Sequence, residues 1–126
     1  IHGPVTLDGK ELIGFAMQQL PLDAACLAGL SYEPYLQPAK APAIYRGTLQ
    51  VDEVGDTFLD MSTWSKGAVW VNGHGLGRYW DLGPQQTLFV PASFLKPGRN
   101  EVIVLETDTV REASLTGIKH QIFENQ

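Results

Sequence analysis

The sequence predicts an all-β fold, an antiparallel β-sandwich built from short strands. Between residues 45 and 51 apolar and polar residues alternate, which is the pattern of a strand with one buried face. Asn72-Gly73 lies between two β-favouring segments and is the strongest short-range signal for a hairpin. Turn residues recur through the rest of the chain at spacings of about ten, as they do in sandwiches and barrels.

The bulk composition agrees with one globular domain. The 126 residues are 44% hydrophobic and 18% charged, which is enough to form a core without cross-links. The net charge is −5 with no basic run, so we expect neither nucleic acid nor a membrane surface as a partner. No apolar run approaches the roughly 20 residues of a membrane span. The single cysteine, Cys26, allows no disulfide within the chain and is expected to be a small buried residue.

Two parts are expected along the chain. Residues 1–22 form a link or the last hairpin of a preceding domain, because Asp8-Gly9 lies between short apolar runs. The absence of Met before Ile1 indicates either a processed piece of a longer protein or a chosen boundary. Residues 23–126 form the sandwich domain. It opens with a short helix over residues 23–30, for which Asp23 is the N-cap and Gly29 the terminator.

The strands of the sandwich follow a proline-rich loop over residues 33–42, which holds three prolines. Strands are predicted over residues 45–51, 57–61 and 86–90, with the hairpin over 66–80. A helical turn over 92–95 and a tight turn over 96–100 come next. Residues 101–107 contain four consecutive apolar residues, which indicates a strand covered on both faces. Residues 116–123 are expected to form a closing strand.

Three stretches of the second half of the chain carry a family resemblance. They read GDTFLDMSTWSKG over residues 55–67, AVWVNGHGLGRYW over 68–80 and GPQQTLFVPASFLKPGRNEVIVLE over 83–106. The segment from residue 45 to 106 thereby resembles the C-terminal β-sandwich domain of glycoside hydrolase family 35 β-galactosidases. The early GPVTLDGKEL and PLD are also similar to the family's link from a preceding sandwich, whereas residues 24–44 carry no matching motif.

The resemblance implies a galactose-binding-domain-like sandwich of the jelly-roll type, and a role for it. Members of the family are multidomain enzymes that remove terminal β-D-galactosyl groups with retention, using carboxylates in a (β/α)₈ barrel. At 126 residues this chain is too short for such a barrel of about 250 residues. The resemblance therefore implies a non-catalytic accessory domain that braces the parent's catalytic barrel, with no cofactor and no metal. It also implies an extracellular, periplasmic or lysosome-like compartment.

Hydrolysis by this chain alone is not expected. A retaining glycosidase needs two carboxyl groups about 5–5.5 Å apart, and none of the available acids has an evident partner. Three of them lie together in a predicted turn, where solvated charge or a calcium site are the two interpretations. His2, His74 and His120 are far apart and show no triad or metal-ligand spacing. The acids considered are Asp52, Glu53, Asp56, Asp60, Asp81, Glu101 and Glu106.

Aromatic, amide and charged side chains cluster around the predicted hairpin, and three interpretations of them stay open. Flat aromatic faces beside multi-donor groups suit a sugar, which would make the chain an autonomous carbohydrate-binding module for galactosides. The same residue types anchor protein interfaces, here against the catalytic barrel. Trp70 is expected in the core, and an exposed face around Leu76, Tyr79 and Trp80 would instead indicate an assembly surface. The candidate residues are Trp64, Asn72, His74, Arg78, Tyr79, Trp80 and Asp81.

Overall fold

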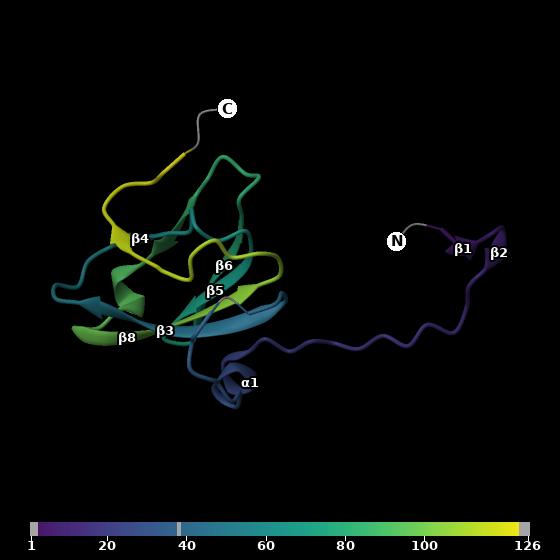
Figure 1. The fold of residues 1–126 in the computed structure, drawn as a ribbon, viewed down its shortest axis with the longest axis horizontal. Helices are drawn as coiled ribbons and strands as arrows, with labels where there is room; N and C mark the ends of the chain where they lie inside the picture. The colour runs from purple at the N-terminus through teal and green to yellow at the C-terminus, as the bar shows by residue number, and fades with distance from the viewer. Residues whose placement is uncertain (1–2, 38, 124–126) are drawn as a thin grey trace.

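The computed structural model describes residues 3–37 and 39–123 and confirms the all-β sandwich. All of its strand pairs are antiparallel, and two sheets face one another across a single core (Figure 1). The strands are β1 (Thr6–Leu7), β2 (Lys10–Glu11), β3 (Ala43–Val51), β4 (Thr57–Asp60), β5 (Lys66–Val71), β6 (His74–Trp80), β7 (Thr87–Val90), β8 (Gly98–Glu106) and β9 (Gly117–Ile118).

The larger sheet has the order β3-β8-β5-β6, so β8 is an interior strand with a neighbour on each side. Its consecutive apolar residues are buried on both faces: Val102 and Val104 point into the core, and Ile103 is buried outside the core cluster. The prediction of a strand covered on both faces is confirmed. Tyr45 and Leu49 of β3 also pack against the core, as their alternation with polar residues predicts.

The smaller sheet has the order β7-β4-β9 and closes the sandwich from the other side. Leu59 and Val90 from this sheet meet Val69 and Val71 from the larger one, and all four are fully buried. The predicted closing strand over residues 116–123 is shorter than expected. Within this stretch the paired strand is β9 alone, which pairs with β4, while Phe123 forms an isolated bridge with Gln85.

The β5–β6 hairpin is the predicted one. Asn72 and Gly73 have φ values of 48° and 81°, the positive pair that a type I′ turn requires. A register shift between Val69 and Trp70 marks a β-bulge. The expectation that Trp70 belongs to the core is wrong. Because Val69 and Val71 take the inward face, strand alternation turns Trp70 to the outer face, where it is half-buried.

Helix α1 (Ala24–Ala28) is the predicted short helix and lies beside β3, outside the two-layer core (Figure 1). Asp23 caps it by accepting a hydrogen bond from the Cys26 backbone N–H at 2.8 Å, and Gly29 follows as the C-cap. Leu27 is the buried residue of the helix. Cys26 is only half-buried, so its predicted burial is wrong, since so short a helix turns a single side chain fully inward.

The N-terminal segment extends away from the sandwich (Figure 1). Asp8 and Gly9, with φ values of 51° and 77°, form the turn of the β1–β2 hairpin, which confirms the predicted hairpin. Ile13 is 85% exposed and Met17 94% exposed. His2 and Pro38, one of the three prolines of the loop over residues 33–42, lie outside the described residues. In the part of the chain that the structure describes, no helix has the length and apolarity needed to cross a membrane.

Candidate functional site

Strand β6 ends in the Arg78-Tyr79-Trp80 run, and its three side chains point to alternate faces. Arg78 and Trp80 are exposed on the outer face, whereas Tyr79 between them is buried in the core. Leu76 of the same strand packs against the core from a half-buried position. The expected exposed face around Leu76, Tyr79 and Trp80 is therefore reduced to Trp80, and the assembly-surface interpretation loses two of its three residues.

Trp80 is the exposed aromatic of this surface, with half of its area open to solvent (50%). The ammonium group of Lys66, its cross-strand partner, lies 4.3 Å from the ring centroid. A cation over an indole face is attracted by the ring quadrupole, so Lys66 holds the ring in place from one side. Trp80 and Arg78, together with Lys66 and the neighbouring Asp81, form what we call the β6 surface.

Behind the β6 surface, Tyr79 closes a buried polar cluster around Glu106, which is 1% exposed. The Tyr79 hydroxyl lies 3.0 Å from the Leu105 carbonyl oxygen and 3.3 Å from Glu106 Oε2. Burial raises the pKa of the Tyr79 phenol well above its ordinary value, and the adjacent Glu106 carboxylate raises it further. Tyr79 is therefore a neutral structural residue rather than a sugar-facing one.

The Glu106 carboxylate accepts hydrogen bonds from the backbone of three residues. The N–H of Ser65 donates to Oε2 at 2.8 Å, and those of Lys66 and Asp108 donate to Oε1 at 3.0 and 2.8 Å. Ser65 Oγ also donates to the Thr109 carbonyl. With Tyr79 added, the buried charge is satisfied by four donors, which fix the start of β5 against the end of β8.

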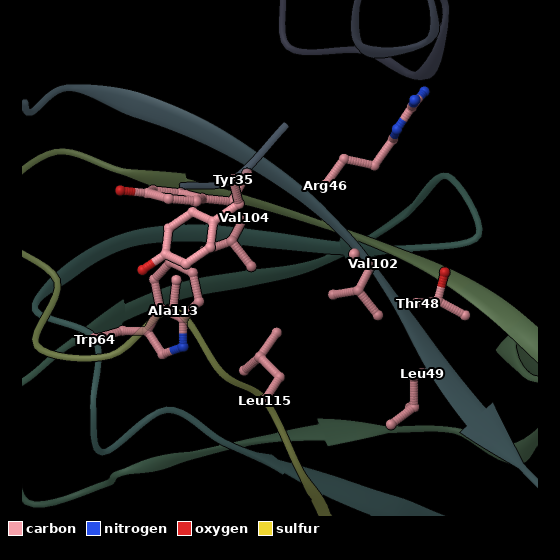
Figure 2. A pocket seen from close by; sticks show the side chains of 11 residues that line it. Tyr35, Arg46, Thr48, Leu49, Trp64, Val102, Val104, Ala113 and Leu115 are labelled. Carbon is pink, nitrogen blue, oxygen red and sulfur yellow. The ribbon is translucent and has the colours of Figure 1, made fainter. Parts of the chain in front are cut away.

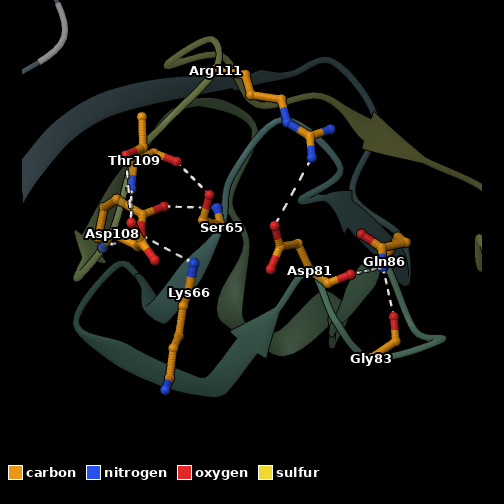
Figure 3. A network of polar contacts seen from close by, with 9 residues as sticks. Ser65, Lys66, Asp81, Gly83, Gln86, Asp108, Thr109 and Arg111 are labelled. Atoms are coloured by element: carbon orange, nitrogen blue, oxygen red, sulfur yellow. Dashed lines mark hydrogen bonds and ion pairs between the residues drawn. The ribbon is translucent and has the colours of Figure 1, made fainter.

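Asp81 lies at the edge of this cluster, where the side chain is partly exposed (Figure 3). Its carboxylate is 3.9 Å from the Arg111 guanidinium, a distance at which an exposed ion pair contributes little stability. The Asp81 backbone is held more firmly: its N–H donates to the Ser65 carbonyl at 2.7 Å, and its carbonyl accepts from Gln86 Nε2 at 3.3 Å. The Asp81 carboxylate is therefore partly open to solvent and lies toward Arg111.

Asn72 and His74, at the far end of the hairpin, belong to a separate cluster. Asn72 Nδ2 donates to the carbonyl of Phe94 at 2.7 Å and to Asn100 Oδ1 at 2.8 Å, while its Oδ1 accepts from the Glu101 N–H at 3.0 Å. The imidazole of His74 stacks on the Phe94 ring at 4.3 Å. Every polar atom of the Asn72 side chain thus has a protein partner, which ties the hairpin to the β7–β8 connection.

Trp64 lies apart from both groups, in the core. Its indole N–H donates to the Ser114 carbonyl at 2.8 Å, and its ring meets Tyr45 edge to face at 5.2 Å. The seven candidate residues therefore do not form one site. Arg78, Trp80 and Asp81 share the β6 surface, Tyr79 lies beneath it, Asn72 and His74 lie at the turn, and Trp64 is internal.

The remaining acids are dispersed. Asp56 Oδ1 accepts from the Ala92 N–H and Asp60 Oδ1 from the Ser62 N–H, so both carboxylates bind backbone N–H groups of the sandwich. Among residues 3–37 and 39–123, no group of three or more His, Cys, Asp or Glu side chains could hold a metal ion.

Sequence reasoning did not assign two residues that organise these clusters, Glu106 and Asn100. Glu106 appeared as one acid in a strand, and Asn100 as part of a tight turn. Their partners lie some 30–40 positions away, at Ser65, Lys66 and Asn72, which no local pattern reveals. The only available signal was a polar residue at each end of an otherwise apolar strand.

Comparison with known proteins identifies the domain. The family model described as "Beta-galactosidase, galactose-binding domain" matches residues 42–100. Beta-galactosidase-1-like protein 3 of Homo sapiens is 38% identical over 110 residues, which cover 84% of this chain and 17% of that protein. Beta-galactosidase 17 of Arabidopsis thaliana is 40% identical, with 98% of this chain and 20% of that protein covered.

A bacterial relative is also matched over a small share of its length. Beta-galactosidase of Xanthomonas manihotis is 37% identical over 91 residues, which cover 71% of this chain and 14% of that protein. The chain spans about a sixth of the length of the first curated relatives that it matches, at 16–17% of each. The matched region contains β3 to β7 and the start of β8, and so most of the sandwich. Residues 42–100, a little under half of the chain, therefore match the galactose-binding domain family of β-galactosidases.

Proposed function

We propose that this chain is a non-catalytic accessory domain of an enzyme that hydrolyses terminal β-D-galactosyl groups, and that it braces the catalytic (β/α)₈ barrel of that enzyme. The family match and the small share of each relative that the chain covers support the accessory role. The observation that carries the proposal is that polar side chains of the candidate site and its surroundings already have hydrogen-bond partners inside the domain. Glu106, Tyr79 and Asn72 are all bonded within the sandwich.

The bracing contact is assigned to the β6 surface. Arg78 and Trp80 point outward side by side on the edge strand of the larger sheet, and both residue types are enriched at interface hot spots. Lys66 fixes the Trp80 ring before any partner binds, which lowers the entropic cost of docking. A planar guanidinium beside a rigid indole suits a partner surface that is apolar and carries a carboxylate at its edge.

A hydrolysis assay tests the non-catalytic part of this proposal. The purified chain is expected to give no turnover of a chromogenic β-galactoside at any pH between about 4 and 8, where glycosidase carboxylates operate. Turnover that is lost in Asp81→Asn would contradict the proposal, because Asp81 is the partly exposed carboxylate of the β6 surface.

The bracing role is tested in the longer parent enzyme. Trp80→Ala should lower the thermal midpoint of the parent, whereas the isolated chain should keep its own midpoint, because half of the Trp80 area already faces solvent. Phe89→Ala is the matched control, since Phe89 is 45% exposed and lies on the other sheet. Equal effects of Trp80→Ala on the parent and on the isolated chain would assign Trp80 to folding instead.

A second candidate function is carbohydrate binding by the same surface. Trp80 has one face covered by Lys66 and half of its area open, and the exposed Arg78 two residues before it offers hydrogen-bond donors. Titration with galactose or lactose should then change the tryptophan fluorescence, and Trp80→Ala should remove the response. Absence of a response at high sugar concentration would leave the structural role.

The division of the chain is part of the proposal. Residues 1–22 are assigned to a link or a last hairpin of a preceding domain, and residues 23–126 to the sandwich. Support comes from the exposed apolar residues of the N-terminal segment, which include Ile13, Phe15, Met17 and Leu20. Such a run is typical of a surface that another domain covers.

A further inference from the structure

A cavity of about 220 Å³ lies on the inner side of the larger sheet, between β3 and residues 113–115 (Figure 2). Two strands provide one wall, with Leu49 from β3 and Val102 and Val104 from β8. Leu115 and Trp64 provide the opposite side, and Tyr35 lies at one end (Figure 2). Tyr45 also lines the cavity. The cavity is separate from the β6 surface, because the order β3-β8-β5-β6 puts the two at opposite edges of the sheet.

The walls of this cavity are apolar and already fixed by packing. Val102, Val104 and Trp64 are buried members of the core. Tyr45 meets Trp64 edge to face at 5.2 Å, and Tyr35 meets Tyr45 at 6.1 Å with an interplanar angle of 61°. A further ring would therefore find both aromatic edges and faces, the arrangement that aromatic groups prefer.

Three of the polar side chains around the cavity, Trp64, Tyr45 and Arg46, have partners elsewhere. The Trp64 indole N–H donates to the Ser114 carbonyl, and the Tyr45 hydroxyl accepts from the Ala39 N–H at 3.1 Å. The Arg46 guanidinium lies 4.3 Å from the Tyr32 ring centroid and points away from the cavity (Figure 2). A hexose would lose the hydration of several hydroxyls here without enough donors and acceptors to replace it, which is unfavourable.

The size of the cavity selects among apolar ligands. A dry cavity of about 150 Å³ lined by aliphatic and aromatic side chains is known to bind benzene in another protein. At about 220 Å³ the present cavity has room for one six-membered ring with a small substituent. Tyr35, which is 55% exposed, also lines the cavity and carries a hydroxyl group that could bond such a substituent.

We propose that this cavity is a binding site for a small molecule with a single neutral aromatic ring, of the phenol class. The ring lies against Val102, Val104 and Leu115, edge-on to Tyr45, and a polar substituent faces the Tyr35 hydroxyl. This site is independent of the accessory role and of sugar binding at the β6 surface.

Titration of the full chain with phenol and with benzene tests the proposal. Both should produce saturable shifts in the methyl NMR signals of Leu49, Val102, Val104 and Leu115, and both should raise the thermal midpoint, because they bind only the folded state. Galactose at equal concentration should leave these methyl signals unchanged. Absence of saturable methyl shifts with either aromatic compound, or equal shifts with galactose, would overturn the proposal.

A cavity-filling variant locates the site. Ala113→Leu places a larger side chain in the cavity and should weaken phenol binding by about tenfold or more. Ala68→Leu, on the outer side of β5, is the control and should bind phenol like the unaltered chain. If Ala113→Leu does not fold, Leu115→Phe replaces it, since it fills the same volume from a half-buried position. Unchanged affinity in the folded filling variant would contradict the assignment.

Discussion

At the scale of single residues, the sandwich depends on two amide side chains that meet at 2.8 Å, Asn72 and Asn100. Asn100 is fully buried, and all four of its hydrogen-bonding positions are filled. Its Nδ2 donates to the carbonyls of Lys96 and Gly98, and its Oδ1 accepts from the Lys96 N–H and from Asn72. No other residue type offers two donors and two acceptors in this shape.

Asn72→Gly separates the turn conformation from the side chain. Glycine accepts the positive φ at no steric cost, so the loss of stability reports the three side-chain hydrogen bonds. At roughly 0.5–1.5 kcal/mol each, we expect the free energy of unfolding to fall by about 2–4 kcal/mol in urea denaturation. Asp8→Gly, at the same position of the exposed β1–β2 turn, is the control and should change it by less than about 0.5 kcal/mol.

Ionisation of Tyr79 lowers the stability of the domain at alkaline pH. Because burial raises the pKa of Tyr79 above the ordinary value of 10.0, its contribution to stability is complete below pH 10 and is lost as the pH rises above it. Tyr79→Phe should lower the free energy of unfolding at pH 7 by about 1–3 kcal/mol through the lost hydroxyl contacts. It should also flatten the decline above pH 10. A decline of unchanged slope in the variant would assign the alkaline loss of stability to another group.

At the scale of elements, β5 and β8 approach each other unusually closely at Gly67. A Cβ atom there would lie 1.7 Å from the Leu105 carbonyl oxygen and 2.8 Å from the Tyr79 hydroxyl. The first contact is with backbone of an interior strand, which cannot move without disturbing β3 as well. Gly67 is thus the residue that permits the Tyr79–Glu106 cluster to form.

Gly67→Ala is therefore expected to lower the free energy of unfolding by about 3 kcal/mol or more, at the upper end of the overpacking range. Gly47→Ala on β3 is the matched control, because a Cβ there meets no atom within 4 Å. The control should fall within about 1 kcal/mol of the unaltered chain. Thermal unfolding followed by circular dichroism measures both. Equal midpoints for the two variants would show that β5 and β8 can separate locally.

The same scale shows what the sequence can predict. Local signals specify the hairpin at Asn72-Gly73, the Asp23-capped helix and the alternation of β3, because each depends on neighbouring residues. The predictions that Trp70 lies in the core and that the last strand spans residues 116–123 were wrong. Both features depend on how a strand packs against the opposite sheet. The candidate site was only partly recoverable. Arg78, Trp80 and Asp81 come together, but Tyr79 and Trp64 are drawn inward by partners distant in sequence.

At the scale of the whole molecule, the chain has a stable part and an attached segment. The core packs the larger sheet against the smaller sheet, whereas residues 3–22 extend away from both (Figure 1). Removal of residues 1–22 should therefore leave the thermal midpoint within about 2 °C, well under the 4–8 °C that 1 kcal/mol produces in a small domain. It should also reduce self-association in size-exclusion chromatography, because exposed Ile13, Phe15 and Met17 are lost. A larger fall in the midpoint would place the boundary elsewhere.

The pairing of β3 with β8 has a consequence for how the chain acquires its shape. Ala43 pairs with Glu106 and Val51 with Gly98, so β3 has its hydrogen-bonded neighbour only after nearly the whole domain has been synthesised. Closing so long a loop is entropically costly, and proteins dominated by such distant pairings fold in milliseconds to seconds. In a nascent chain leaving the ribosome, β3 stays an unpaired strand until β8 has emerged. During that interval β3 would be accessible to a chaperone.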